Sequence, residues 1–164
     1  MDRRKLHFDD LSEAVKEFER LLDSGYSQLG NWSLAQMALH LRLTIDASVD
    51  GYPKWMSLFA PIRPILRTLA LPRLLRGDST KGIPTAPMFE PKSSTLEDEV
   101  EVQLLKESIE RFRNHTGKFY PHPGFGLANL ESLDPFHAAH CAHHLGFLVP
   151  ATGQPNSATS HETA

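Results

Sequence analysis

The stretch FHAAHCAHHLGFLV, residues 136–149, places four histidines among small and apolar side chains. Asp134 and Pro135 fit the cap and the first turn of a helix that runs through this stretch to Pro150. Such a helix is apolar enough to be buried, and a buried imidazole needs a polar partner. We therefore expect a core helix in which several histidines bind the same partner, and a metal ion can be that partner.

The spacing of these histidines limits which of them can bind the same ion. Residues three or four apart on a helix are neighbours, so His140 has three possible partners, which are His137, His143 and His144. His137 and His144 are seven residues apart, about 10.5 Å along the axis, which is too far for one ion. His140 and His144 share the apolar side of the helix, and we prefer this pair. Cys141 is expected to pack in the core rather than to bind.

A second helix is expected to supply the third ligand. The segment GNWSLAQMALHLRLTIDASV, residues 30–49, has Ser33 as its cap and Gln36 three residues later, which together form a capping box. A lone helical histidine such as His40 is more often a hydrogen-bonded core residue than a ligand. Beside the pair on the last helix, however, it is the one histidine on another predicted helix. The predicted site is one divalent ion held by His40, His140 and His144.

Two further helices complete the predicted fold. One spans about residues 10–24 and stops at Gly25, and the other starts at Thr95 or Ser94. The buried face of the latter is expected to carry Leu96, Val100, Leu104, Ile109 and Phe112. No alternating strand pattern is present. The sequence predicts an all-α four-helix bundle over residues 1–150, with a long insertion between its second and third helices and a disordered tail at 151–164.

The insertion begins with an unusual basic segment. Between Pro53 and Arg76 the chain has no acidic residue, several prolines and five cations, which are Lys54, Arg63, Arg67, Arg73 and Arg76. The prolines predict short helical pieces. We expect its apolar side chains to pack on the bundle above the site, with arginines that suit an anionic group. The alternative is a peripheral membrane surface, which we disfavour.

Composition excludes several functional classes. The formal net charge of −3 gives no support for nucleic-acid binding. Cys141 is the single cysteine, so no internal disulfide forms, which fits a reducing compartment. The N-terminus has no apolar segment of a signal peptide, and no apolar run is long enough to span a membrane. We expect a cytoplasmic protein.

Three motifs resemble a known superfamily. GNWSLAQ at 30–36 followed by His40, HPGFG at 122–126, and the histidine-rich stretch at 136–148 resemble the DinB-like (YfiT-type) superfamily of metalloproteins. Within it they are most similar to a bacterial branch known mainly as a domain of unknown function. The resemblance implies an up-down-down-up bundle with a three-histidine site completed by water. Relatives bind zinc, nickel, iron or manganese; some transfer low-molecular-weight thiols such as bacillithiol or mycothiol, and others have been proposed as hydrolases. Phe147 departs from the glutamine that many relatives have there.

These observations lead to a functional hypothesis. Three neutral histidines leave a coordination position open, as in catalytic metal sites. We expect a metal-dependent enzyme that acts on a small molecule, by thiol transfer or hydrolysis, with His143, His122 and Asp46 as candidates for the general base. The alternative is a non-catalytic metal-binding or scaffold bundle. A homodimer is a further expectation, since related bundles often dimerise.

Overall fold

Helices make up most of the protein. The computed structural model describes residues 3–78, 86–92 and 95–151, in which the helices are accompanied by one small two-stranded sheet. The predicted tail at 152–164 and parts of the predicted loop, 79–85 and 93–94, lie outside the described residues. No helix in the described part of the chain is long and apolar enough to cross a membrane.

The first two long helices begin and end where local sequence signals place them. α1 (Leu11–Ser24) is capped by Asp10 and stops at Gly25, whose φ of 67° favours glycine. α2 (Leu34–Asp50) has the predicted capping box of Ser33 and Gln36. These signals act within one helical turn, so the helix ends that they set can be predicted without knowledge of the rest of the fold.

The predicted start of the third long helix is wrong, and its buried face is predicted only in part, because Ile109 and Phe112 are buried as expected. α5 (Asp98–Arg113) begins after Glu97, and Val100 and Leu104 are 55% and 37% exposed. The apolar residues buried on this helix are Val102, Leu105, Ile109 and Phe112. Both sets recur at helical spacing, and the packing of α5 against α1 and α2 selects the second.

The start of the last helix is also corrected. α6 (Leu130–Leu145) begins five residues before Pro135, because the side chain of Asn129 accepts a hydrogen bond from the backbone N–H of Ser132. Pro135 therefore lies inside the helix, where it removes one backbone donor but keeps a helical φ. The longer helix places His137, His140 and His144 on it as predicted.

Two short strands, which no alternating pattern in the sequence indicated, add to the predicted helices. β1 (Tyr26–Gln28) follows α1 and pairs antiparallel with β2 (Leu148–Pro150), which follows α6. Ser27 lies opposite Val149 in this register. Each strand has three residues, too few to show an alternating pattern. The sheet joins the C-terminal ends of α1 and α6.

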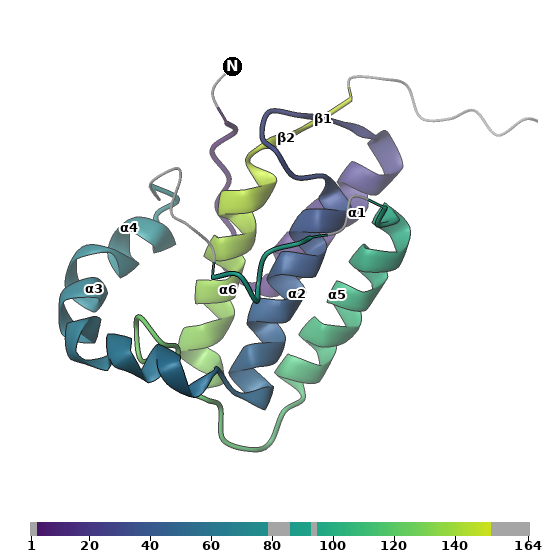
Figure 1. Ribbon diagram of the computed structural model, residues 1–164. Coiled ribbons are helices and arrows are strands. Elements are labelled where there is room, and N and C mark those ends of the chain that lie inside the picture. Colours follow the sequence, from purple (N-terminus) through teal and green to yellow (C-terminus); the bar gives the residue numbers. More distant parts are fainter. Residues whose placement is uncertain (1–2, 79–85, 93–94, 152–164) are drawn as a thin grey trace, which may run out of the picture.

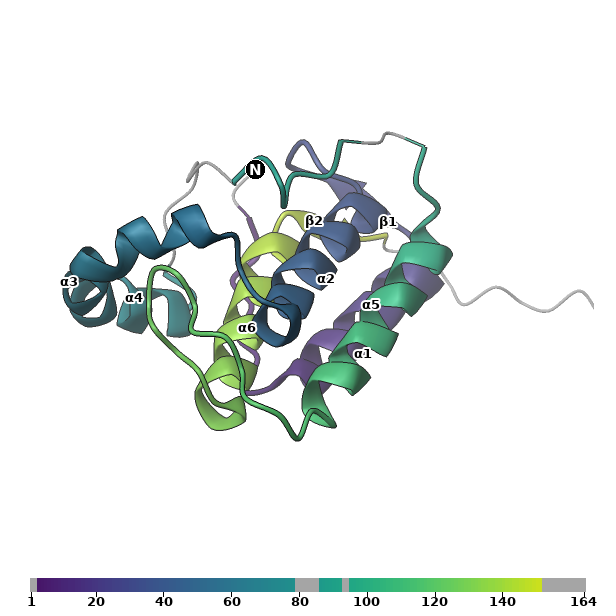
Figure 2. The ribbon, with the colours of Figure 1, turned by 60° about the horizontal axis from the view of Figure 1, so that its bottom comes forward.

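One core holds the long helices together. α1, α2, α5 and α6 lie side by side in Figures 1 and 2, and each contributes side chains to one cluster of buried apolar residues. The largest buried members include Phe18 from α1, Ile45 from α2, Phe112 from α5 and Leu133 from α6. α2 and α6 are neighbours in this arrangement, which brings their histidines within reach of each other.

The basic segment forms three short helical pieces, as its prolines predict. They are η1 (Lys54–Ile62, a 3₁₀ helix), α3 (Arg63–Leu69) and α4 (Leu71–Leu75), which form an arc beside α6 in Figures 1 and 2. Met56 is buried against Ala47 and Phe89, so the arc is anchored. The expectation that its apolar residues pack on the helices is only partly met, because Leu58 and Ile65 are 78% and 60% exposed.

Candidate metal centre

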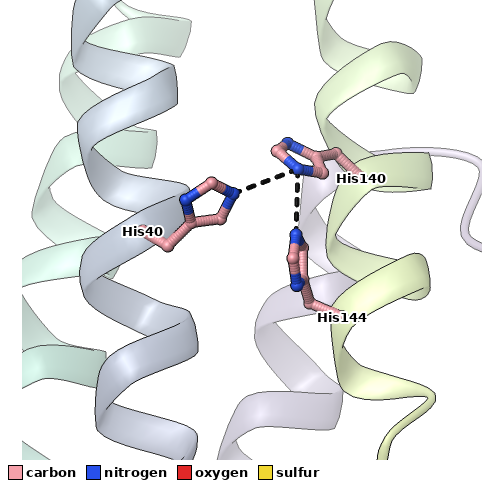
Figure 3. A group of neighbouring side chains, drawn as sticks. All are labelled: His40, His140 and His144. Atoms are coloured by element: carbon pink, nitrogen blue, oxygen red, sulfur yellow. Dashed lines mark hydrogen bonds between the residues drawn. The ribbon is translucent and has the colours of Figure 1, made fainter. Parts of the chain in front are cut away.

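Three imidazoles meet between α2 and α6. His40 extends from α2, and His140 and His144 extend from consecutive turns of α6 towards it (Figure 3). Nε2 of His140 lies 3.2 Å from Nε2 of His40 and 3.0 Å from Nε2 of His144. One ligand nitrogen from each of the three residues lies within 4.8 Å of the others. The structure therefore brings together the three histidines that the sequence predicts as ligands.

These separations are close to those of a metal centre. Nitrogens that bind one tetrahedral ion at about 2.0–2.1 Å lie about 3.3–3.4 Å from one another. The distances of 3.2 and 3.0 Å from Nε2 of His140 fall slightly below this value, and the three ligand nitrogens all lie within 4.8 Å of one another. Side-chain rotations that adjust these separations would bring the three nitrogens to ligand geometry.

The backbone fixes the tautomer of His40. Its Nδ1 lies 2.8 Å from the carbonyl oxygen of Phe89. A carbonyl only accepts, so Nδ1 holds the proton and donates it, and Nε2 presents a lone pair to the cluster. Metal-binding histidines almost always donate their second N–H to a carbonyl or carboxylate in this way.

Hydrogen bonds alone satisfy the cluster poorly. Nε2 of His140 faces both other Nε2 atoms, yet one ring nitrogen has either one proton or one lone pair. Nδ1 of His140 is buried and has no hydrogen-bond partner among the described residues. Three lone pairs directed at one cation would resolve the conflict among the Nε2 atoms, and the donor set therefore fits a divalent metal ion.

The surroundings keep these imidazoles neutral. Burial lowers the pKa of His40, and burial together with the neighbouring imidazoles holds the pKa values of His140 and His144 well below the ordinary value. Trp32 stacks on His144 with ring centroids 5.4 Å apart and lies 5.1 Å from His40. Metal binding requires the neutral form of histidine, so the low pKa values favour it.

A cavity of about 410 Å³ adjoins the three histidines. η1, α3 and α4 line it from one side through Met56, Phe59, Leu66 and Leu74. This agrees with the prediction that the basic segment covers the site. No arginine or lysine lines the cavity among the described residues, so the expected anion-binding role of the segment is not supported. Arg63 instead donates to the carbonyl oxygen of Pro123.

The three candidates for a general base differ in position. Asp46 does not line the cavity but binds Ser108 and Arg111 between α2 and α5. His143 and His122 do line it, and burial lowers the pKa of each to about 4.

Hydrogen bonds at Nδ1 assign the protons of these two rings. Nδ1 of His143 accepts from Arg3 at 2.6 Å, and Nδ1 of His122 accepts from the backbone N–H groups of Gly124 and Phe125. Each neutral ring therefore has its proton on Nε2. The remaining nitrogen of each ring is a donor, which is a poor arrangement for a base.

Sequence reasoning missed a buried hydrogen-bonded chain at the cavity wall. Ser48 Oγ lies 2.9 Å from Nε2 of His137 and 3.0 Å from the hydroxyl of Tyr52. His137 and Tyr52 line the cavity. Burial raises the pKa of Tyr52 to about 12, so its hydroxyl stays protonated at neutral pH. Ser48 and Tyr52 have no local motif that would reveal a contact with a residue 89 positions from Ser48.

Two other residues behave as simple packing groups. Cys141 is a free, fully buried cysteine, and burial raises the pKa of its thiol. This agrees with its predicted role in the core. Phe147 is not among the residues that line the cavity, and the guanidinium of Arg3 lies over its ring, 5.7 Å from the centroid.

Fold and site together define a mostly helical protein with three clustered histidines that could hold a metal ion beside an apolar cavity. The chain belongs to the family described as "Protein of unknown function (DUF1569)", whose model matches residues 1–151. No curated protein and no solved structure matches the chain. The family agrees with the expected domain of unknown function and names no reaction.

Proposed function

We propose that this protein is a metal-dependent enzyme of the DinB-like kind that acts on a small, uncharged and largely apolar molecule. The observation that supports this most directly is the convergence of three imidazole nitrogens beside a cavity. A closed structural site would have a fourth protein ligand. Among the described residues the metal-type cluster has three members only, so an ion there would keep a position open towards a substrate.

Each histidine has a distinct part in holding the ion. His40 is oriented by the Phe89 carbonyl and offers Nε2. His140 and His144 offer their Nε2 atoms from one helix, four residues apart. A divalent ion held by these groups would supply Lewis acidity, which lowers the pKa of a water molecule or a thiol. Hydrolysis and thiol transfer are the two reaction classes that this chemistry serves.

The cavity lining indicates what kind of substrate fits. Among the described residues that line it, none is an arginine, lysine, aspartate or glutamate. An unpaired charge in such surroundings costs several kcal/mol, so an anionic group is a poor occupant away from the metal. The polar groups that remain are neutral and include His122, His143 and Tyr52.

Tyr52 is placed to orient such a substrate. Nδ1 of buried His137 has no partner among the described residues, and an orphaned lone pair is less costly than an orphaned N–H. Nε2 of His137 therefore donates to Ser48, whose Oγ also lies 3.0 Å from the Tyr52 hydroxyl. Tyr52 lines the cavity, and its hydroxyl is the group that would bind an oxygen of the substrate there.

Metal content tests the proposal. Full-length protein purified without a histidine tag should contain about one divalent ion per chain by elemental analysis. His40→Ala and His144→Ala should lose it, because either change removes one of three ligands. His7→Ala is the matched control, since His7 is exposed and pairs with Asp9. Reaction screens with uncharged esters and with thiol acceptors then separate hydrolysis from thiol transfer.

Two other results would contradict the enzyme proposal. If wild-type protein remains metal-free after reconstitution with zinc, nickel, iron and manganese, the three imidazoles are a hydrogen-bonded core cluster and the enzyme proposal fails. If metal binds and stabilises the fold but no substrate reacts, the protein is the metal-binding scaffold that the sequence left as the alternative.

A further inference from the structure

A large apolar surface is exposed on η1 and α3. Large hydrophobic side chains recur there every three or four residues and are more than two fifths exposed; they are Trp55, Leu58, Phe59, Ile62, Ile65 and Leu69. Here we call this set the η1–α3 face. Monomeric proteins rarely expose apolar residues so densely unless the surface meets a partner or a membrane. The arc that holds it lies at the periphery, away from α1 and α5 (Figures 1 and 2).

The segment that carries this face is basic, and the first acidic residue after it, Asp78, pairs with Arg76 at 4.0 Å. Residues 53–77 contain five cations and no acidic residue. The formal net charge of the whole chain is −3, so removal of these five positive charges leaves −8 on the rest. The protein is therefore strongly polarised, with its basic and exposed apolar residues in the same segment.

This uneven distribution of charge distinguishes between two possible partners of the η1–α3 face, a second copy of the chain and a membrane. In a symmetric dimer the same patch meets itself, and like charges would then lie together. An anionic bilayer instead attracts the cations and accepts the apolar side chains, and it repels the acidic remainder of the chain. Trp55 suits the interface between headgroups and acyl chains, where tryptophan is enriched.

From this combination we propose that the η1–α3 face docks the protein on the surface of an anionic lipid membrane. The long stems of Arg67 and Arg73 lie along the bilayer surface with their guanidinium groups at lipid phosphates. Leu58 and Ile65 enter the boundary of the acyl chains. The same arc lines the cavity through Phe59 and Leu66, so docking places that cavity beside the membrane surface. This inference does not depend on a metal at the histidine centre.

Vesicle co-sedimentation tests it. Full-length protein, with a chelator present, is mixed with vesicles of phosphatidylcholine alone or of phosphatidylcholine with phosphatidylserine. We expect binding to the anionic vesicles at low salt, little binding to the neutral ones, and a steep loss as salt rises. Trp55 emission should shift to the blue with anionic vesicles, and Trp55→Phe should remove the shift.

Matched variants separate the apolar and basic contributions. Ile65→Glu should weaken binding at least tenfold, while Val100→Glu on α5 should leave it unchanged, because the two side chains are similarly exposed at 60% and 55%. Arg67→Gln combined with Arg73→Gln should weaken it about thirtyfold, since each cation near an anionic surface contributes about fivefold.

Three results would overturn the proposal. The first is wild-type protein that stays in the supernatant with anionic vesicles at low salt. The second is equal binding by Ile65→Glu and Val100→Glu. The third is a dimer in sedimentation velocity that Ile65→Glu dissociates, which would show that a second copy of this chain covers the face.

Discussion

Replacing Ser48 by alanine tests the buried chain that fixes His137 at the cavity wall. Ser48 is fully buried, and its Oγ bonds both Nε2 of His137 and the hydroxyl of Tyr52. Nδ1 of His137 has no partner among the described residues. Ser48→Ala therefore leaves both nitrogens of a buried imidazole without a hydrogen bond.

The expected loss of stability follows from this geometry. A buried polar group left without its partner costs about 1–3 kcal/mol, and here that group is the Nε2–H of His137. We expect Tyr52 to contribute less, because it lines the cavity and is only partly buried. We expect Ser48→Ala to lower the free energy of unfolding by about 1–3 kcal/mol, which corresponds to about 2–4 °C in Tm per kcal/mol for a chain of this size.

Urea unfolding followed by circular dichroism, in chelator at neutral pH, measures the effect. Ser57→Ala is the matched control, because Ser57 is exposed and bonds only the nearby carbonyl of Lys54 among the described residues. It should change the stability by less than about 0.5 kcal/mol. The loss of stability caused by Tyr52→Phe should lie between those of Ser48→Ala and Ser57→Ala. The slope m should stay constant, because none of these changes alters the surface exposed on unfolding.

A double variant sharpens the test. Ser48→Ala combined with His137→Leu also removes the imidazole, so the buried N–H of His137 is no longer left unpaired, and it should recover part of the stability lost by Ser48→Ala. The reasoning is refuted if Ser48→Ala is as stable as Ser57→Ala. It is also refuted if the double variant loses the sum of the two single losses, because additivity would mean that the two side chains do not interact.

Three further predictions concern pH, capping and thiol reactivity. Burial lowers the pKa of His122 to about 4 and of His137 to about 3, so the unfolded chain takes up protons first as pH falls. Stability should therefore be complete above about pH 6.5 and fall by about 2–3 kcal/mol per histidine by about pH 4.5 in a urea series; a flat profile would contradict this. Asp98→Ala should lower Tm by several degrees, because Asp98 accepts from the backbone N–H of Ala35 in the first turn of α2 and from the hydroxyl of partly buried Tyr26, whereas exposed Glu99→Ala should not. Cys141 should resist dithionitrobenzoate in the native protein and react at the rate of unfolding, and rapid native labelling would show that its site opens locally.

The accuracy of the fold prediction depends on the range over which each signal acts. The cap of α2 is complete within Ser33 to Gln36, so it can be predicted from four residues. The face of α5 cannot, because Val100 and Leu104 recur at the same helical spacing as the residues that are buried. Only the positions of α1 and α2 decide between the two faces. β1 and β2 pair across more than a hundred residues and are too short to show a pattern.

The basic segment shows a different limit. Its prolines predict short helical pieces, and the structure has them at η1, α3 and α4. Whether its apolar side chains are buried is a question of how much surface the long helices can cover. Met56 packs against Ala47 and Phe89, whereas the apolar residues on the outer side of the arc remain exposed among the described residues. Periodicity alone does not contain that information.

In the candidate site, too, some features follow from local sequence and others depend on the packing of distant residues. The spacing of His140 and His144 on one helix, with His40 on another, was enough to predict which imidazoles meet. The tautomer of His40 was not predictable, because it is set by the backbone carbonyl of Phe89. Every residue has a backbone carbonyl, so the sequence does not show which one will meet the ring. What places this carbonyl is the burial of the Phe89 ring against Ala47 and Met56. Histidine spacing therefore predicts which imidazoles meet, whereas apolar packing of a distant loop decides which nitrogen of His40 faces the cluster, and the arrangement of these three rings requires both.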